Sequence, residues 1–324
     1  MIDGRNILIT GGTGSLGRRL VRLLLDEHEP NVVRIFSRDE LKQSEMAERF
    51  EHSPKLRFFL GDVRDQQRLR RACVEIDVVI HAAALKQVPA CEYNPFEAVK
   101  TNILGAQNVI EAAIDLGVHR ILNVSTDKAV NPINLYGATK LCAEKIFANG
   151  NAYTGKQDTI FSSVRYGNVV RSRGSVIPLF QKQRSKGVVS VTDKRMTRFW
   201  ITRDRAARFV LSSLGAMAGG ETFIPKIPSM NIVDLAAAVA PECAVREVGI
   251  RHGEKLHETL ISSDEAFGAV ECDDRYIIRP AFQWKGETLK DGGRALPEGF
   301  SYTSENNPWF LTVDDMREML STTD

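Results

Sequence analysis

The feature that most constrains the fold is a glycine-rich turn, Thr10–Gly17 (TGGTGSLG), which follows a short apolar run. The segment after it, Arg18–Asp26, carries leucines at helical spacing. Gly11 permits a tight turn, Gly14 lets the backbone approach a pyrophosphate, and Gly17 lets the helix pack closely on the strand. The helix N-terminus then offers N–H groups and a positive dipole end to phosphates. This strand–turn–helix context predicts a dinucleotide site.

Strand-like and helix-like segments alternate through the first half of the chain. Short apolar runs predict strands at Asn6–Thr10, Val32–Phe36, Leu56–Leu60, Asp77–Ala84, Arg120–Val124 and Ile160–Tyr166. Longer runs predict helices at Arg18–Asp26, Arg38–Phe50, Phe96–Leu116 and Tyr136–Ala148. The alternation predicts the α/β class, with a doubly wound parallel sheet of the Rossmann type and ligand sites at the carboxyl ends of its strands.

The pattern becomes less regular after about residue 167. Loops rich in glycine, arginine and proline mix there with short helical segments at Asp204–Ala216, Ile232–Ala240 and Thr312–Leu320. We therefore predict a dinucleotide-binding domain over residues 1–166 and a smaller, less regular substrate-binding portion over residues 167–324. Some chain around residues 190–216 is expected to return to the first domain.

Composition excludes several classes of protein. The 43 Lys and Arg nearly balance the 41 Asp and Glu, which argues against a general nucleic-acid binder. No apolar run approaches the ~20 residues of a membrane span, and the first residues lack the pattern of a secretory signal. The five cysteines are scattered without a CxxC pair, so neither a disulfide framework nor a metal site is expected. A reduced, cytoplasmic chain fits these features.

The end of the second strand indicates which dinucleotide binds. A carboxylate there would bind the 2′-hydroxyl of NAD, but Ser37 and Arg38 follow the strand instead. A hydroxyl and a guanidinium suit the 2′-phosphate of NADP, which is the predicted cofactor. Asp39 is the competing signal, because it could bond a ribose; alternatively it caps a helix.

Further strand ends complete the predicted cofactor site. Asp62 and Val63 are placed to meet the adenine, and Ala82–Ala84 are small enough for the cofactor to lie against the fourth strand. The full set of predicted cofactor-binding residues is Gly11, Thr13, Gly14, Ser15, Leu16, Gly17, Ser37, Arg38, Lys42, Asp62, Val63, Ala82, Ala83, Ala84, Tyr136 and Lys140.

A second cluster of residues points to acid–base chemistry. Tyr136 and Lys140 are spaced to share one helix face. A lysine cation and an oxidised nicotinamide should draw the phenol pKa from about 10 toward neutrality, so that the tyrosine can take a proton from a substrate hydroxyl. Thr126-Asp127-Lys128 ends a strand just before this helix. It adds a hydroxyl, an acid and an amine; the alternative for the charged pair is a solvated loop ion pair.

Together these motifs resemble the extended short-chain dehydrogenase/reductases. Within them, Thr126-Asp127-Lys128 resembles the inverting UDP-N-acetylglucosamine 4,6-dehydratases, whereas retaining relatives carry Thr-Asp-Glu and simple 4-epimerases lack the acid–base pair. Further segments extend the resemblance over nearly the whole chain, among them His81–Cys91, Met196–Thr202, Pro225–Met230 and Gly249–Glu258. Two residues depart from it: Arg171 stands where glycine is usual, and His252 where proline is expected.

The resemblance implies an NADP-dependent lyase that converts UDP-GlcNAc to a UDP-4-keto-6-deoxy-L-arabino-hexulose. Tyr136, supported by Lys140, takes the O4 proton, and Thr126 positions O4. Lys128 then removes the C5 proton while Asp127 protonates the departing O6, which requires a lowered pKa for the amine and a raised one for the carboxyl. Hydride returns to C6. A UDP-sugar 4-epimerase and a retaining 4,6-dehydratase remain alternatives, because the sequence does not fix the outcome at C5.

The expected partner is a UDP-sugar, whose diphosphate needs cationic or polar side chains. The candidates are Lys86, Asn168, Arg198, Arg251 and Glu254. In contrast, His81, Met196, Phe199 and Trp200 are expected to be packing residues. The resemblance also implies a homo-oligomer, without indicating the number of subunits.

Overall fold

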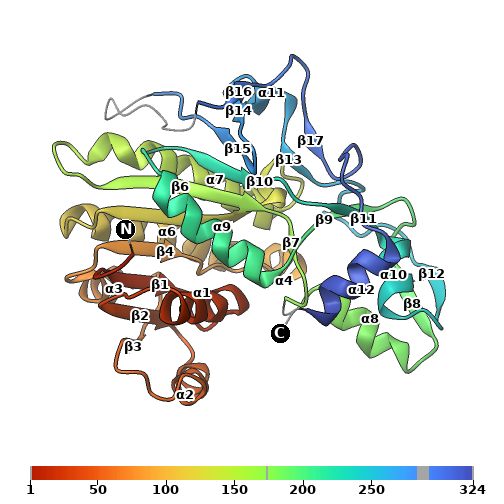
Figure 1. The fold of residues 1–324 in the computed structure, drawn as a ribbon, viewed down its shortest axis with the longest axis horizontal. Helices are drawn as coiled ribbons and strands as arrows, with labels where there is room; N and C mark the ends of the chain where they lie inside the picture. Colours follow the sequence, from red (N-terminus) through yellow and green to blue (C-terminus); the bar gives the residue numbers. More distant parts are fainter. Residues whose placement is uncertain (1, 173, 283–291, 323–324) are drawn as a thin grey trace.

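A large twisted sheet organises the computed structural model, which describes residues 2–172, 174–282 and 292–322. Its strand order within these residues is β16-β14-β15-β10-β6-β5-β4-β1-β2-β3 (Figure 1). The strands are β1 (Asn6–Thr10), β2 (Val32–Ser37), β3 (Leu56–Leu60), β4 (Val78–His81), β5 (Arg120–Thr126), β6 (Ile160–Tyr166), β10 (Thr222–Pro225), β14 (Ala269–Glu271), β15 (Arg275–Ile278) and β16 (Arg294–Ala295). From β3 to β10 neighbours run parallel, which confirms the predicted doubly wound sheet.

Helices cover both faces of this sheet, as the side chains of β1 show. Ile7 and Ile9 pack with α1 (Ser15–Asp26) and α9 (Arg203–Ala216), which cross the front of the sheet in Figure 1. Leu8, between them, packs on the opposite face with α3 (Gln66–Cys73), α6 (Gly105–Asp115) and α7 (Leu135–Gly150). Successive side chains of a strand point to opposite faces, so a continuous apolar run fits a strand covered on both sides. The helix α2 (Glu40–Arg49) lies beside β2 and β3.

Several predicted boundaries differ from the observed ones around the loop after β4. The strand ends at His81 rather than at residue 84, and the predicted helix over 96–116 is divided into α5 (Pro95–Val99), a π-helical turn and α6. A short helix, α4 (Val88–Tyr93), precedes them. Asn102 lies in the π-turn and ties it to the loop: its buried side-chain amide accepts from the N–H of Leu85 at 2.8 Å and donates to the Leu85 carbonyl at 2.9 Å. The turn thereby holds the loop beneath the carboxyl ends of the strands.

The C-terminal portion is less regular and has an apolar cluster of its own. Its helices are α8 (Val176–Arg184), α10 (Ile232–Val239), α11 (Ser263–Ala266) and α12 (Val313–Ser321), the last confirming the predicted terminal helix. Its strands are β7 (Asn168–Val169), β8 (Val188–Val191), β9 (Thr197–Ile201), β11 (Ser229–Asn231), β12 (Ala244–Glu247), β13 (Thr259–Ile261) and β17 (Tyr302–Thr303). Figure 1 shows most of this portion on the right.

Chain from beyond residue 166 returns to the large sheet over a longer stretch than the expected 190–216. The helix α9 packs against α1, where Arg19 pairs with Asp204, and the strands β10, β14, β15 and β16 then extend the sheet. The strands β8 and β9, within the expected stretch, belong instead to small separate sheets. The division of the chain at residue 166 stays a prediction. None of the helices in the described ranges is long and apolar enough to cross a bilayer.

Candidate active site

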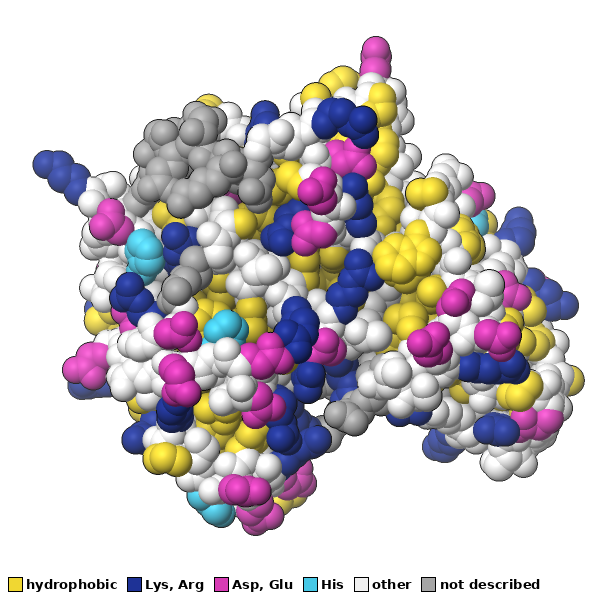
Figure 2. All heavy atoms as spheres, in the orientation of Figure 1, with side chains coloured by type: hydrophobic (Ala, Val, Ile, Leu, Met, Phe, Trp, Pro, Cys, Tyr) yellow, Lys and Arg dark blue, Asp and Glu magenta, His cyan; other side chains and the backbone are white. Residues whose placement is uncertain are grey.

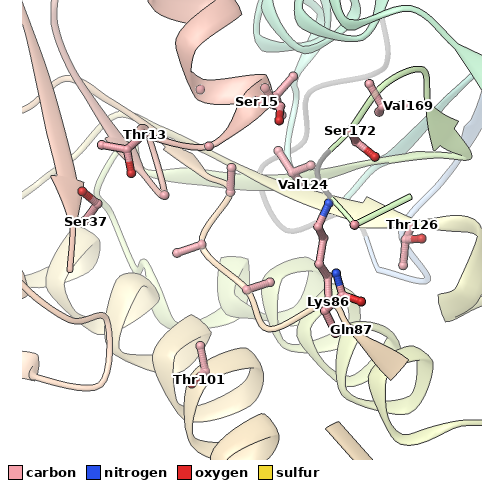
Figure 3. A pocket seen from close by; sticks show the side chains of 18 of the residues that line it. Thr13, Ser15, Ser37, Lys86, Gln87, Thr101, Val124, Thr126, Val169 and Ser172 are labelled. Carbon is pink, nitrogen blue, oxygen red and sulfur yellow. The ribbon is translucent and has the colours of Figure 1, made fainter. Parts of the chain in front are cut away.

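A cavity of about 920 Å³ lies at the carboxyl ends of the parallel strands. It opens beside β1 and β4, where the strand order changes direction, which is where doubly wound sheets bind ligands. Figure 2 shows Lys and Arg side chains gathered near the middle of this face, between the large sheet and the C-terminal portion. All of the predicted cofactor-binding residues line the cavity, and Figure 3 shows several of them around it.

The glycine turn is packed so closely that side chains would not fit. Gly11 has a φ of 68°, and a Cβ there would lie 2.8 Å from the backbone nitrogen of Ala83. A Cβ on Gly17 would lie 2.3 Å from the carbonyl oxygen of Gly12. Gly14 begins α1 without a side-chain cap, and the first helical turn holds no acidic residue. The helix N-terminus is therefore open to an anion, as a pyrophosphate requires.

The end of β2 supplies cationic and hydroxyl groups to one end of the cavity. Asp39 is the N-cap of α2, since its carboxylate accepts from the backbone N–H of Lys42 at 3.0 Å and also pairs with the Lys42 amine. The capping alternative for Asp39 is therefore confirmed. The Arg38 guanidinium lies 3.6 Å from Asp62 and is 55% exposed, and the Ser37 hydroxyl accepts from Gln43 at 3.0 Å. These groups fit a cofactor that carries an additional phosphate on its ribose.

Tyr136 and Lys140 are both buried at the start of α7, whose N-cap Asn134 accepts from the N–H of Gly137 at 2.8 Å. Burial lowers the pKa of Lys140 to about 8 and raises that of Tyr136 to about 12. The groups that oppose the shift in the tyrosine pKa are Lys128 and a hydrogen bond with Thr126. The expected fall of the phenol pKa is thus not produced by these side chains, and the cation that acts on the phenol is Lys128.

The Thr126-Asp127-Lys128 segment ends β5 and enters a 3₁₀ turn. Nζ of Lys128 lies 3.1 Å from Asp127 Oδ1 and 3.1 Å from Glu258 Oε1, and it donates to Asn168 at 3.4 Å. Asp127 is 0% exposed, so the alternative of a solvated loop pair is wrong.

The charges around this segment set its protonation. Burial raises the pKa of Asp127 despite the nearby amine, as the proposed acid requires. Burial alone would lower the pKa of Lys128, but Asp127 and Glu258 outweigh burial and raise it. The expected lowering of the amine pKa was therefore wrong, because a second carboxylate lies beside it.

Lys128 and Thr126 line the cavity, whereas Asp127 lies behind them and is not among the described lining residues. A Cβ on Gly167 would lie 3.3 Å from Asp127 Oδ2 and 2.5 Å from the Phe199 side chain. Gly167 therefore leaves room for the buried carboxylate.

Glu258 is the member of this cluster that sequence reasoning missed. In the sequence, Glu258 was indicated only by its place at the end of Gly249–Glu258, a segment that resembles the family. Its spacing from Lys128 in the sequence does not predict that the two side chains meet.

The predicted substrate residues divide into two groups. Lys86 and Asn168 line the cavity, and Figure 3 shows Lys86 extending toward Val124. Arg198, Arg251 and Glu254 are not among the described lining residues. Contacts of this second group with a substrate stay a prediction.

The second group has other partners in the structure. Arg198 donates to the backbone carbonyls of Lys255 and Leu256 at 2.9 and 2.8 Å. Arg251 lies 3.7 Å from Glu254.

The remaining predictions concern packing and backbone. His81 is buried, bonds the Thr10 hydroxyl at 2.8 Å and stacks on Phe147, which confirms it as a core residue. Burial also confirms the packing residues Met196, Phe199 and Trp200. Arg171 has a φ of 54°, in the left-handed region that favours glycine, which accounts for glycine being usual there. Nothing in the structure explains His252.

Comparison with known proteins agrees with this geometry. The family described as "Polysaccharide biosynthesis protein" matches residues 7–280. UDP-N-acetylglucosamine 4,6-dehydratase (inverting) of Campylobacter jejuni is 50% identical over 333 residues, covering 100% of this chain and 99% of that protein. UDP-glucose 4-epimerase of Rickettsia conorii is 38% identical over 338 residues, covering 100% and 97%. The X-ray structure of Pen from Bacillus thuringiensis superposes with a TM-score of 0.91 at 38% identity, covering 99% and 98%. The chain therefore belongs to the polysaccharide biosynthesis protein family.

Proposed function

We propose that the protein is an NADP-dependent UDP-N-acetylglucosamine 4,6-dehydratase that inverts C5. The observation that carries the proposal is the Lys128 amine, which lines the cavity while a buried carboxyl, Asp127, contacts it at 3.1 Å. Tyr136 and Thr126 line the same cavity. The 50% sequence identity to the Campylobacter enzyme, which extends over the whole chain, supports this substrate and this outcome at C5.

The glycine turn and the end of β2 suit NADP. The backbone of Gly14–Gly17 would hold the pyrophosphate, while Ser37, Arg38 and Lys42 would hold the 2′-phosphate, because all of them line the cavity. When bound, NADP would supply reversible hydride chemistry between C4 and C6 of the sugar, with no net redox change.

Tyr136 has the role of taking the O4 proton. Its hydrogen bond with Thr126 places both hydroxyl groups at the cavity, so Thr126 can position O4 while the phenol acts as the base. Lys128 is the nearby cation that favours the phenolate. The C4 ketone that results makes the C5 proton acidic, so a second base is needed near C5.

Lys128 and Asp127 supply that base and its paired acid. Moving one proton across their 3.1 Å contact converts an ammonium and a carboxylate into a neutral amine and a carboxylic acid. The amine takes the C5 proton from the cavity side. In the structure the Thr126 hydroxyl donates to Asp127 Oδ1 at 3.0 Å and Thr126 lines the cavity; with Asp127 protonated, this hydroxyl would instead accept the acid proton and pass its own proton to the departing O6. A proton from the medium, added to the opposite face of C5, then inverts that carbon.

Incubating the purified protein with UDP-GlcNAc and following the products by NMR tests this function. The expected product carries a C6 methyl group, a C4 ketone and the inverted configuration at C5. UDP-GalNAc without a C6 methyl signal would overturn the proposal in favour of a 4-epimerase, the second candidate, which the full-length similarity to the Rickettsia protein supports. A methyl product with unchanged C5 would indicate a retaining dehydratase.

We also propose that the enzyme is cytoplasmic and forms a homo-oligomer. The five cysteines are free, which suits the reducing cytoplasm. The side chains of Tyr93 and Phe96 are highly exposed on neighbouring helices, which suits a homo-oligomer. Light scattering of the purified chain would measure the assembly, and a mass equal to one chain would refute the oligomer.

A further inference from the structure

A buried carboxylate from the C-terminal portion reaches the amine of Lys128. Glu258 directly precedes β13 and is 3% exposed, and its Oε1 is as close to Nζ of Lys128 as Asp127 Oδ1 is, at 3.1 Å. Within the described residues, Glu258 Oε2 and Asp127 Oδ2 are buried and lack a hydrogen-bond partner. Buried polar atoms of this kind are costly and need an explanation. Two buried carboxylates therefore share one amine.

The backbone that carries Glu258 is fixed from two sides. Its N–H donates to the Ser304 hydroxyl at 2.9 Å, and its carbonyl accepts from the N–H of Ser304 at 2.8 Å. Arg198 donates to the carbonyls of Lys255 and Leu256, just before it in the chain. The backbone of Glu258 is thus fixed by contacts within the C-terminal portion.

Two carboxylates and one guanidinium determine the electrostatic environment of the Lys128 amine. Asp127 and Glu258 raise the pKa of the amine against the effect of burial, while Arg198, which lies 3.8 Å from Glu258, opposes them. Burial would raise the pKa of Glu258 itself, but Lys128 and Arg198 outweigh burial and lower it. The nearby cations therefore favour the ionised form of Glu258. The other titratable groups that interact with Lys128 are Lys86, Tyr136 and Lys255.

We propose that Glu258 is a positioning residue for Lys128: it holds the amine against Asp127 and facing the cavity, and it keeps one proton within the Asp127–Lys128 pair. The inference rests on the proposed function, in which Lys128 removes the C5 proton. Asp127 neighbours Lys128 in the chain and restrains the amine from one side only. Glu258 approaches from a separate segment and fixes its direction.

The role predicts a specific change in the pH profile. Catalysis needs one proton on the Asp127–Lys128 pair, and loss of that proton at high pH ends the reaction. Removing the charge of Glu258 removes one cause of the raised pKa of Lys128. The alkaline limb of kcat in Glu258→Gln should therefore move to lower pH by about 1–3 units, the range for a charge within a few ångströms. KM should change little, because Glu258 is not among the described residues lining the cavity.

The experiment measures the rate of C6-methyl formation over a range of UDP-GlcNAc concentrations between about pH 7 and 11, so that kcat and KM are separated. It compares the wild type with Glu258→Gln, Glu258→Asp and the control Glu305→Gln. Glu305 belongs to the same region but is 58% exposed and faces His257 at 3.5 Å, so the control should match the wild type. Circular dichroism checks the fold of each variant.

The outcomes separate the inference from the function on which it rests. A wild type that forms no methyl product refutes the proposed function. A folded Glu258→Gln variant whose alkaline limb stays in place overturns the positioning role. If that variant does not fold, Glu258→Asp decides: it keeps the charge but shortens the reach, so it should keep the limb and lose at least about fivefold in kcat. An unchanged kcat in Glu258→Asp overturns the role.

Discussion

Replacing Lys128 with methionine should destabilise the protein, because the amine is the partner of two buried carboxylates. Its Nζ lies 3.1 Å from both Asp127 and Glu258, which are 0% and 3% exposed. Removing one partner of a buried ion pair costs about 3–5 kcal/mol, since the remaining charge is left uncompensated. Methionine keeps most of the side-chain length and packing. The decrease in the free energy of unfolding therefore measures the missing positive charge rather than the creation of a cavity.

The loss should depend on pH with a definite sign. Without Lys128 the largest cause that lowers the pKa of each carboxyl disappears while burial remains, so we expect the pKa of both carboxyls to rise. A carboxyl with a raised pKa binds more protons in the folded state, so folding gains stability as pH falls through that pKa. We expect the full loss of about 3–5 kcal/mol near pH 8.5 and a clearly smaller loss near pH 5.5.

Urea unfolding followed by circular dichroism at both pH values measures this. The free energy of unfolding of Lys128→Met is compared with that of the wild type and of Lys128→Arg, which keeps a cation at the same place. A loss below about 1 kcal/mol, or one of equal size at both pH values, would mean that the cluster behaves like a hydrated surface pair and that the charge argument is wrong.

Three further changes test other parts of the site. Tyr136→Phe should slow methyl formation about 10²–10⁴-fold in the NMR assay, and a retained rate would remove the tyrosine from the base role. Arg38→Gln should weaken NADP binding by about 1.5–3 kcal/mol in calorimetry and leave NAD binding unchanged, because a charged hydrogen bond to the 2′-phosphate is lost; equal losses for both cofactors would contradict this. Gly17→Ala places a Cβ 2.3 Å from the Gly12 carbonyl and should lower stability by about 1–3 kcal/mol in thermal unfolding, whereas an unchanged Tm would contradict the close packing.

The parallel half of the fold was predictable because its signals are local. Apolar runs, helical periodicity and the glycine turn each lie within a few residues of the element they specify. The strands β10, β14 and β15 were not predicted, since they are short and gain their place only by pairing with one another and with β6. Such pairing depends on contacts between distant segments, which a local pattern does not contain.

The helix α3 was missed for a different reason. Its sequence, QQRLRRAC, is mostly polar, and only Leu69, Ala72 and Cys73 are buried. Its available signal was the cap at Asp65, whose carboxylate accepts from the N–H of Arg68 at 2.9 Å. The π-turn within the predicted helix over 96–116 was not predicted either. Apolar residues continue through the turn, and the bonds that Asn102 makes there are to Leu85, in the loop after β4.

The sequence predicted those residues of the candidate site that lie together in one short motif, but not those contributed by distant segments. The predicted catalytic cluster came from the Thr126–Lys128 motif and its neighbouring helix, and the structure places these residues together. The predicted direction of the shift in the Lys128 pKa was wrong because Glu258, which is distant from Lys128 in the sequence, adds a second negative charge. The sequence provides no distance between these two segments, so their electrostatic coupling appears only in the fold.

The most direct test of the central claim is the C6 methyl resonance formed from UDP-GlcNAc in deuterated buffer, with the wild type and Lys128→Met side by side. We expect the wild type to produce a C6 methyl singlet, because C5 takes up deuterium from the medium, and Lys128→Met to produce no C6 methyl signal. A methyl product from Lys128→Met at the wild-type rate, or a wild-type product that retains hydrogen at C5, would contradict removal of the C5 proton by Lys128.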